Sequence, residues 1–117
     1  MEKFMYLFRG GMTAQSGHSP EAMQAHMQKW IGWMKGLGEK GIIVSGEPLA
    51  PSGKQLTGAR KTITDGPFIE AKEMVGGFLI VSARNIDEAV ETAKGCPILE
   101  VDGNVEVRPV QQMDMPA

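Results

Sequence analysis

The hydrophobic pattern along the chain predicts four core strands. Residues 4–8 are five consecutive apolar or aromatic side chains, and residues 78–81 are four more. Successive side chains of a strand point to opposite faces, so such runs predict strands that are buried on both faces of a sheet. The other two predicted strands are residues 42–49, which open on three aliphatic residues, and the alternating segment 105–108.

Two further segments carry the signals of helices. Ser19-Pro20-Glu21 supplies a capping side chain, a proline suited to the first helical position and an acid at the positive end of the helix dipole. With Gly41 as the stop, this predicts a helix over residues 20–40. Apolar side chains spaced three and four apart predict its core-facing stripe as Met23, Met27, Trp30, Met34 and Leu37. A second helix is predicted after the cap Asn85 and before Gly95.

The order of these elements predicts an α+β fold. Residues 55–64 read as a polar, partly exposed strand within a hairpin insert, since Leu56 and Ile63 are their only large apolar side chains. Strand, helix, strand, hairpin insert, strand, helix, strand is the ferredoxin-like βαββαβ pattern. Right-handed crossovers place both helices on one face of the sheet.

The other face of that sheet is predicted to be apolar as well. A monomer would expose several large side chains there in one patch, which soluble monomers rarely tolerate. We therefore expect a homodimer in which the two helix-free faces pack together by two-fold symmetry.

Composition and charge narrow the class of protein. The 117 residues predict one domain, residues 1–117, and 42% hydrophobic with 22% charged residues is typical of globular chains. A net charge of −2 provides no basic surface for nucleic acid, and no apolar run reaches the roughly 18 residues of a membrane span. One cysteine leaves no disulfide, and no metal-ligand or nucleotide-binding spacing occurs. We expect a cytoplasmic protein with no metal, no cofactor, no nucleic-acid partner and no membrane contact.

One segment of the chain resembles the DGPF signature of the YCII-related family. It begins with Asp65-Gly66-Pro67-Phe68 and continues through acidic, lysine and glycine positions up to Phe78. The surroundings of His26 and the ending at residues 105–109 are also similar to that family. The resemblance covers nearly the whole chain and implies a dimeric α+β barrel, in which two ferredoxin-like sheets close face to face. Some relatives are proposed to carry a His–Asp pair in a pocket, and the resemblance implies that its histidine is His26. The acidic partner in those relatives lies in an Asp-Pro pair after the second helix, where this chain has Cys96-Pro97.

Several polar side chains are candidates for chemistry, and each also has a structural interpretation. His26 lies at the edge of the apolar stripe, where a histidine acts as a general acid or base near neutral pH or simply covers the sheet edge. Asp65 either orients a ligand or shapes the following turn. Glu70 and Glu73 either share a proton or form an exposed charged loop, and Arg9 is a candidate anion ligand.

Two classes of function are open at this stage. The first is a small-molecule enzyme in which His26 moves a proton, oriented by Asp65 or Glu73, on an apolar or carbonyl compound. The second is a non-catalytic ligand-binding or regulatory dimer; a link of some relatives to transcription initiation implies contacts with protein, since the chain is acidic. The expected pocket lies between the first helix and the sheet and is walled by Met27, Trp30 and Met34, with Arg9, Glu70 and Glu73 as further ligand-binding candidates.

Overall fold

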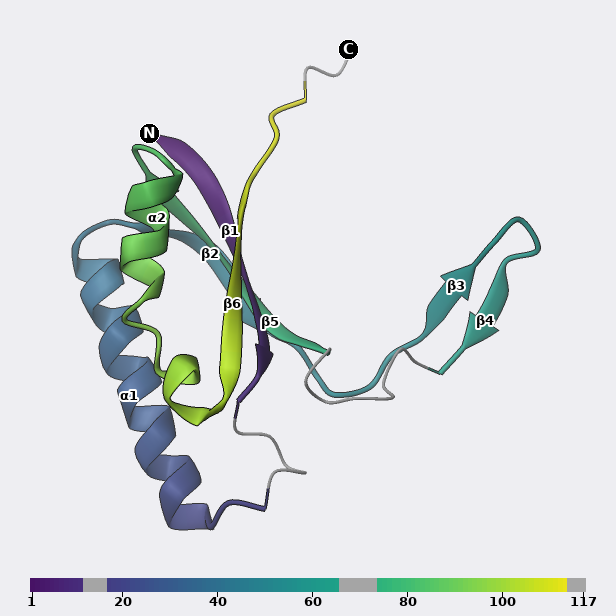
Figure 1. The fold of residues 1–117 in the computed structure, drawn as a ribbon, viewed down its shortest axis with the longest axis horizontal. Coiled ribbons are helices and arrows are strands. Elements are labelled where there is room, and N and C mark those ends of the chain that lie inside the picture. The colour runs from purple at the N-terminus through teal and green to yellow at the C-terminus, as the bar shows by residue number, and fades with distance from the viewer. Residues whose placement is uncertain (12–16, 66–73, 114–117) are drawn as a thin grey trace.

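The computed structural model describes residues 1–11, 17–65 and 74–113 and shows a four-stranded sheet with two helices on one side (Figure 1). The strand order is β2-β5-β1-β6, and every neighbouring pair is antiparallel. This is the ferredoxin-like order, so the predicted fold class is confirmed. The elements run β1 (Glu2–Gly10), α1 (Pro20–Glu39), β2 (Ile43–Pro48), β3 (Gln55–Thr57), β4 (Thr62–Thr64), β5 (Val75–Ala83), α2 (Ile86–Ala93), the short 3-10 helix η2 (Pro97–Val101) and β6 (Gly103–Pro109).

Local side-chain contacts fix where the helices begin. The Ser19 hydroxyl accepts the backbone N–H of Ala22 at 3.1 Å, and the Asn85 side chain accepts that of Glu88 at 2.9 Å. These bonds satisfy donors that have no partner inside the helix. Gly41 follows α1 with a φ of +69°, a conformation that residues with side chains rarely adopt. The predicted caps of both helices are confirmed.

The core lies between the helices and one face of the two central strands, β1 and β5. Trp33 of α1 reaches this face and stacks on Tyr6 with ring centroids 6.4 Å apart. The Tyr6 hydroxyl donates to the carbonyl of Ala89 in α2, which joins the sheet to the second helix. The buried strand residues on this face are Phe4, Tyr6, Phe8, Leu79, Val81 and Ala83.

Helix α1 turns a different stripe toward the core from the one the sequence predicts. Trp30, Trp33 and Leu37 are half-buried or buried, whereas Met27 is 57% exposed and Ile31 is 51% exposed. Met23 and Met34 are exposed as well, so the prediction that they line the core is wrong. Both stripes have helical spacing, and the helix is rotated so that the two indole rings, which offer the larger apolar area, enter the core.

The face of the sheet opposite the helices carries a cluster that we call the open face: Met5, Leu7, Phe78 and Ile80. Met5 pairs with Ile80 and Leu7 pairs with Phe78 across β1 and β5, so the four side chains adjoin. All four are half-buried and none of them belongs to the core. Both helices lie on the other side of the sheet (Figure 1). Within one chain, therefore, the central strands are fully buried on their helix face only.

Strands β3 and β4 form a separate hairpin, residues 54–65, which we call the arm (Figure 1). The predicted hairpin insert is present, but the single strand predicted over residues 55–64 is wrong, because a turn divides it. In that turn Gly58 has a φ of +75° and Lys61 a φ of +56°, and the Lys61 N–H donates to the Gly58 carbonyl at 3.0 Å. The projecting arm gives the chain a radius of gyration of 16.2 Å, against about 13 Å for a compact chain of this length.

Candidate functional site

His26 and Trp30 form a hydrogen-bonded pair on α1. They lie four residues apart, which places their side chains one turn apart on the same helix face. The indole N–H of Trp30 donates to Nε2 of His26 at 2.9 Å. Because an indole nitrogen can only donate, Nε2 carries no proton, and the neutral ring holds its proton on Nδ1. The structure thus brings together two of the residues that the sequence singles out and fixes the protonation of one of them.

Trp30 is itself held by aromatic contacts that extend to the sheet. Its ring meets Phe8 of β1 edge-on at 5.0 Å and Trp33 edge-on at 5.8 Å. These rings fill the space between α1 and β1 where the sequence predicts a pocket. Met27 and Met34 lie on an exposed flank of the helix, so they do not wall that space. His26 therefore lies at the rim of a packed aromatic cluster.

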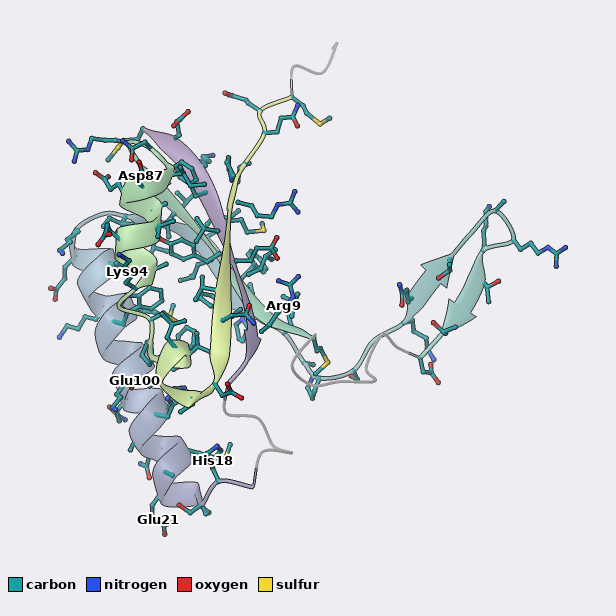
Figure 2. All side chains as sticks on the ribbon, in the orientation of Figure 1. Arg9, His18, Glu21, Asp87, Lys94 and Glu100 are labelled. Carbon is teal, nitrogen blue, oxygen red and sulfur yellow. The ribbon has the colours of Figure 1, made fainter. Side chains whose placement is uncertain are left out.

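Glu100 of η2 is the carboxylate that the structure brings to His26. Burial lowers the pKa of His26 below 6.5; the charge of Glu100 raises it, and the charges of Lys29 and His18 lower it. Glu100 also pairs with Lys29, with 3.0 Å between Oε2 and Nζ. Figure 2 shows His18 and Glu100 on the helix side of the sheet and Arg9 on the opposite side of β6. The imidazole of His26 is therefore neutral at pH 7, and the charge of the Glu100 carboxylate acts on it.

Glu100 and Lys29 are members of the site that the sequence analysis missed. Glu100 lies four residues after Cys96, the position at which the family resemblance implies an acidic residue. An acidic residue a few positions after the Cys96-Pro97 pair was the signal by which the sequence could have identified Glu100. Cys96, which stands in the relatives' acidic position, is buried, and burial raises the pKa of its thiol to about 11. A thiol that is protonated and buried supplies neither a charge nor a nucleophile.

The remaining candidates lie elsewhere or outside the described residues. Arg9 forms an ion pair with Glu106 of β6, which neutralises its charge on the side of the sheet away from His26. Asp65 lies at the base of the arm, 81% exposed, in an ion pair with Lys54, so the structure does not bring it to His26. The predicted sites at Glu70 and Glu73 lie outside the described residues.

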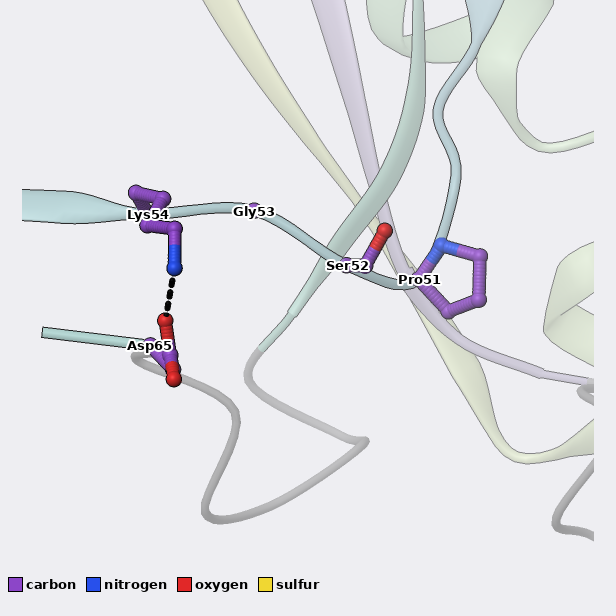
Figure 3. Close-up of a pocket in the computed structure, with 5 residues that line it drawn as sticks. All are labelled: Pro51, Ser52, Gly53, Lys54 and Asp65. Atoms are coloured by element: carbon purple, nitrogen blue, oxygen red, sulfur yellow. Dashed lines mark hydrogen bonds and ion pairs between the residues drawn. The ribbon is translucent and has the colours of Figure 1, made fainter.

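Asp65 does line a shallow depression of about 430 Å³ (Figure 3). All of its lining residues are exposed, and they come from the base of the arm: Pro51, Ser52, Gly53, Lys54 and Asp65. Across residues 1–11, 17–65 and 74–113, no cluster of three or more His, Cys, Asp or Glu side chains could hold a metal ion. No helix in the same ranges is long and apolar enough to cross a membrane.

The strand order and the placement of both helices on one face define a ferredoxin-like α+β domain. The chain belongs to the YCII-related family: the family model, described as a YCII-related domain, matches residues 4–114. A comparison with curated proteins finds no match.

Among solved structures, the chain is similar to the 5-chloro-2-hydroxyhydroquinone dehydrochlorinase of Burkholderia phenoliruptrix AC1100, in complex with 2,5-dihydroxybenzoquinone. The identity is 19%, the match covers 95% of each chain, and the TM-score is 0.49.

Proposed function

We propose that the protein is a small-molecule enzyme in which His26 acts as a general base on a carbonyl compound. The observation that carries this proposal is the neutral imidazole at the rim of the aromatic cluster, held in one orientation by Trp30. A neutral histidine accepts a proton readily near pH 7. The negative charge of Glu100 favours the imidazolium that forms, as an opposite charge does for any ionised group.

The proton goes to Nε2, whose electron pair accepts the Trp30 N–H in the free protein. A bound ketone displaces that hydrogen bond and presents the C–H next to its carbonyl. The C–H bond breaks, the N–H bond forms on Nε2, and the electron pair of the C–H bond becomes the double bond of an enolate. The enolate oxygen carries the negative charge, and Lys29 is a cation beside the site that stabilises it.

Exchange of carbon-bound protons in D₂O tests this proposal without knowledge of the natural substrate. Acetone, acetylacetone and acetophenone are incubated with the protein, and loss of the proton signal next to the carbonyl is followed by NMR. We expect at least one compound to exchange faster than in buffer, His26→Gln to abolish the acceleration, and His18→Gln to retain it. Acceleration that survives in a folded His26→Gln variant would show that another group is the base.

A non-catalytic ligand-binding or regulatory role is the second candidate, and one observation favours it. The electron pair of Nε2 is already engaged, so a ligand that leaves the Trp30 hydrogen bond in place meets no free base. The same compounds then shift the Trp30 indole N–H signal in the NMR spectrum but exchange no faster than in buffer. That pattern would replace the enzyme with a binding protein.

We further propose that two copies of the chain pair through their open faces. The four adjoining apolar side chains of this cluster have no cover from either helix. Charges of both signs lie beside the cluster, where Glu106 of β6 is paired with Arg9 of β1 and lies 3.8 Å from Arg108 of β6. In a two-fold symmetric pair, the same surface of each copy faces the other. Because this surface has both basic and acidic residues at its border, the basic residues of one copy can lie opposite the acidic residue of the other.

A further inference from the structure

The arm makes little contact with its own chain. Every residue from 51 to 65 is exposed, including the only large apolar side chains of the arm, Leu56 at 63% and Ile63 at 64%. Each strand of the hairpin is three residues long. A two-stranded hairpin of this size is marginally stable in water unless something packs against it. The left-handed conformation of Lys61 disfavours the turn further. A contact that covers Leu56 and Ile63 would therefore stabilise the arm.

The arm has one apolar face and one polar face. Leu56 lies opposite Ile63 across the two strands, so their side chains project to the same side. The neighbouring pair, Thr57 and Thr62, projects to the other side. The two faces differ in chemistry, so a partner that covers the apolar face binds the arm in one orientation.

The direction of the arm points to a second copy of this chain as the partner. The arm leaves the sheet where β2 ends and β5 begins, and it extends on the side opposite the helices (Figure 1). A second copy that covers the open face occupies the same side and lies beside the arm. By two-fold symmetry the arm of that copy lies beside the first chain.

Interface area and charge support the same partner. Four strands about 4.8 Å apart and about 25 Å long give a sheet face of roughly 500 Å² in projection. Stable interfaces bury about 800 Å² of accessible surface on each partner, and contacts from the arm add to the area that the sheet face buries. The arm has a net charge of +2, because it contains three basic residues and one acidic residue: Lys54, Arg60, Lys61 and Asp65. The whole sequence has a net charge of −2, so the residues outside the arm carry a net charge of −4. The arm is therefore attracted to the body of another copy and repelled by another arm.

We infer that each chain of the homodimer packs the Leu56–Ile63 face of its arm on the body of the other chain. This exchange of arms rests on the proposed homodimer and is independent of the chemistry of His26. A different protein bound to the arm, or two arms bound to each other, are the competing arrangements.

Isotope-filtered NMR on a mixture of ¹³C-labelled and unlabelled chains tests the inference in the wild-type protein. We expect contacts between the methyl groups of Leu56 and Ile63 and protons of the unlabelled body. Methyl contacts from Ile80 alone would confirm the paired open faces and overturn the arm exchange. Contacts only between two arms would overturn it too. No contact between chains at all, with a monomeric mass, would overturn the homodimer itself.

A pair of variants measures what the arm contributes to assembly. Leu56→Glu places a charge on the apolar face, whereas Thr57→Glu places the same charge on the polar face. We expect Leu56→Glu to raise the dimer dissociation constant about tenfold or more in sedimentation equilibrium, and Thr57→Glu to change it by less than about threefold. Equal effects of the two variants would contradict a contact through the Leu56–Ile63 face.

Discussion

The imidazole of His26 and the indole of Trp30 determine each other's hydrogen-bonding state. Burial lowers the pKa of His26, and the N–H that Trp30 donates to Nε2 also opposes a proton there. Trp30→Phe keeps an aromatic ring in the cluster but removes the donor. We expect the pKa of His26 to rise toward 6.5 in this variant, measured by NMR titration of the ring protons. Trp33→Phe is the matched control and leaves the pKa as in the wild type; the same result for Trp30→Phe would contradict this role of the indole.

The lowered pKa of His26 also makes a prediction for stability. Below pH 6.5 the unfolded chain binds a proton at this residue more readily than the folded chain does. The contribution of His26 is therefore complete above pH 6.5 and is lost as the pH falls from there through the folded-state pKa. Urea unfolding at about pH 7.5 and about pH 5.5 should show a larger loss of stability in the wild type than in His26→Gln. Equal losses of stability in the two proteins would show that folding leaves the pKa of His26 unchanged.

Single residues also show how far the sequence could predict the site. His26 and Trp30 meet within one helix, so their spacing in the sequence was sufficient. Glu100 lies 71 residues from Lys29 along the chain, and only the packing of η2 against α1 brings the two together. The sequence offered no comparable reason to separate Asp65 from His26, because it did not show that the hairpin extends away from the helices.

At the scale of elements, glycines mark where the backbone approaches a neighbour closely and where it does not. A Cβ at Gly46 of β2 would lie 2.3 Å from Cδ2 of Leu79 and 2.7 Å from the carbonyl oxygen of Phe78. A Cβ at Gly32 of α1 would meet nothing within 4 Å. The backbone at Gly46 therefore has no room for a side chain, whereas an alanine would fit at Gly32.

Alanine substitutions at these two glycines should have opposite effects. Gly46→Ala forces β5 and β2 apart, and we expect it to lower the free energy of unfolding by about 2 kcal/mol. Gly32→Ala reduces the conformational freedom of the unfolded chain, and we expect it to raise the free energy of unfolding by about 0.5–1 kcal/mol. Urea unfolding of the two variants beside the wild type measures both. A stabilised Gly46→Ala would contradict the tight contact between β2 and β5.

The elements that the sequence predicted well are those with local signals. Ser19 and Asn85 cap their helices through bonds that span three residues, so the sequence contains the whole interaction. The rotation of α1 has no such local cause, because the methionine stripe and the tryptophan stripe have similar spacing. Contact with Tyr6 and Phe8 on β1 selects the tryptophans, and that contact exists only in the folded sheet.

For the whole molecule, the order of strands and helices was sufficient to predict the topology, since right-handed crossovers leave few arrangements of these elements. In the part of the chain that the structure describes, two apolar features lack cover by a helix: the open face and the Leu56–Ile63 side of the arm. The arm extends on the side of the sheet opposite the helices, which is also the side of the open face (Figure 1). The proposed homodimer would place a second copy of the chain on that side, where it would cover both features at once.

Ile80 and Leu79 distinguish the two faces of β5. Ile80 belongs to the open face, whereas Leu79 is buried against the helices. Ile80→Glu should therefore separate the copies and leave each chain folded, while Leu79→Glu should unfold the chain, because it buries an unpaired charge. Gln24→Glu on the exposed surface of α1 adds the same charge away from the open face and should leave assembly unchanged.

The mass of the protein in solution tests the pairing of open faces most directly. Each chain has a mass of 12.7 kDa, so two chains give 2 × 12.7 = 25.4 kDa. Light scattering at micromolar concentration should report that mass for the wild type and for Gln24→Glu, and the mass of a single chain for Ile80→Glu. A folded wild-type protein at 12.7 kDa would contradict the homodimer and, with it, the exchange of arms.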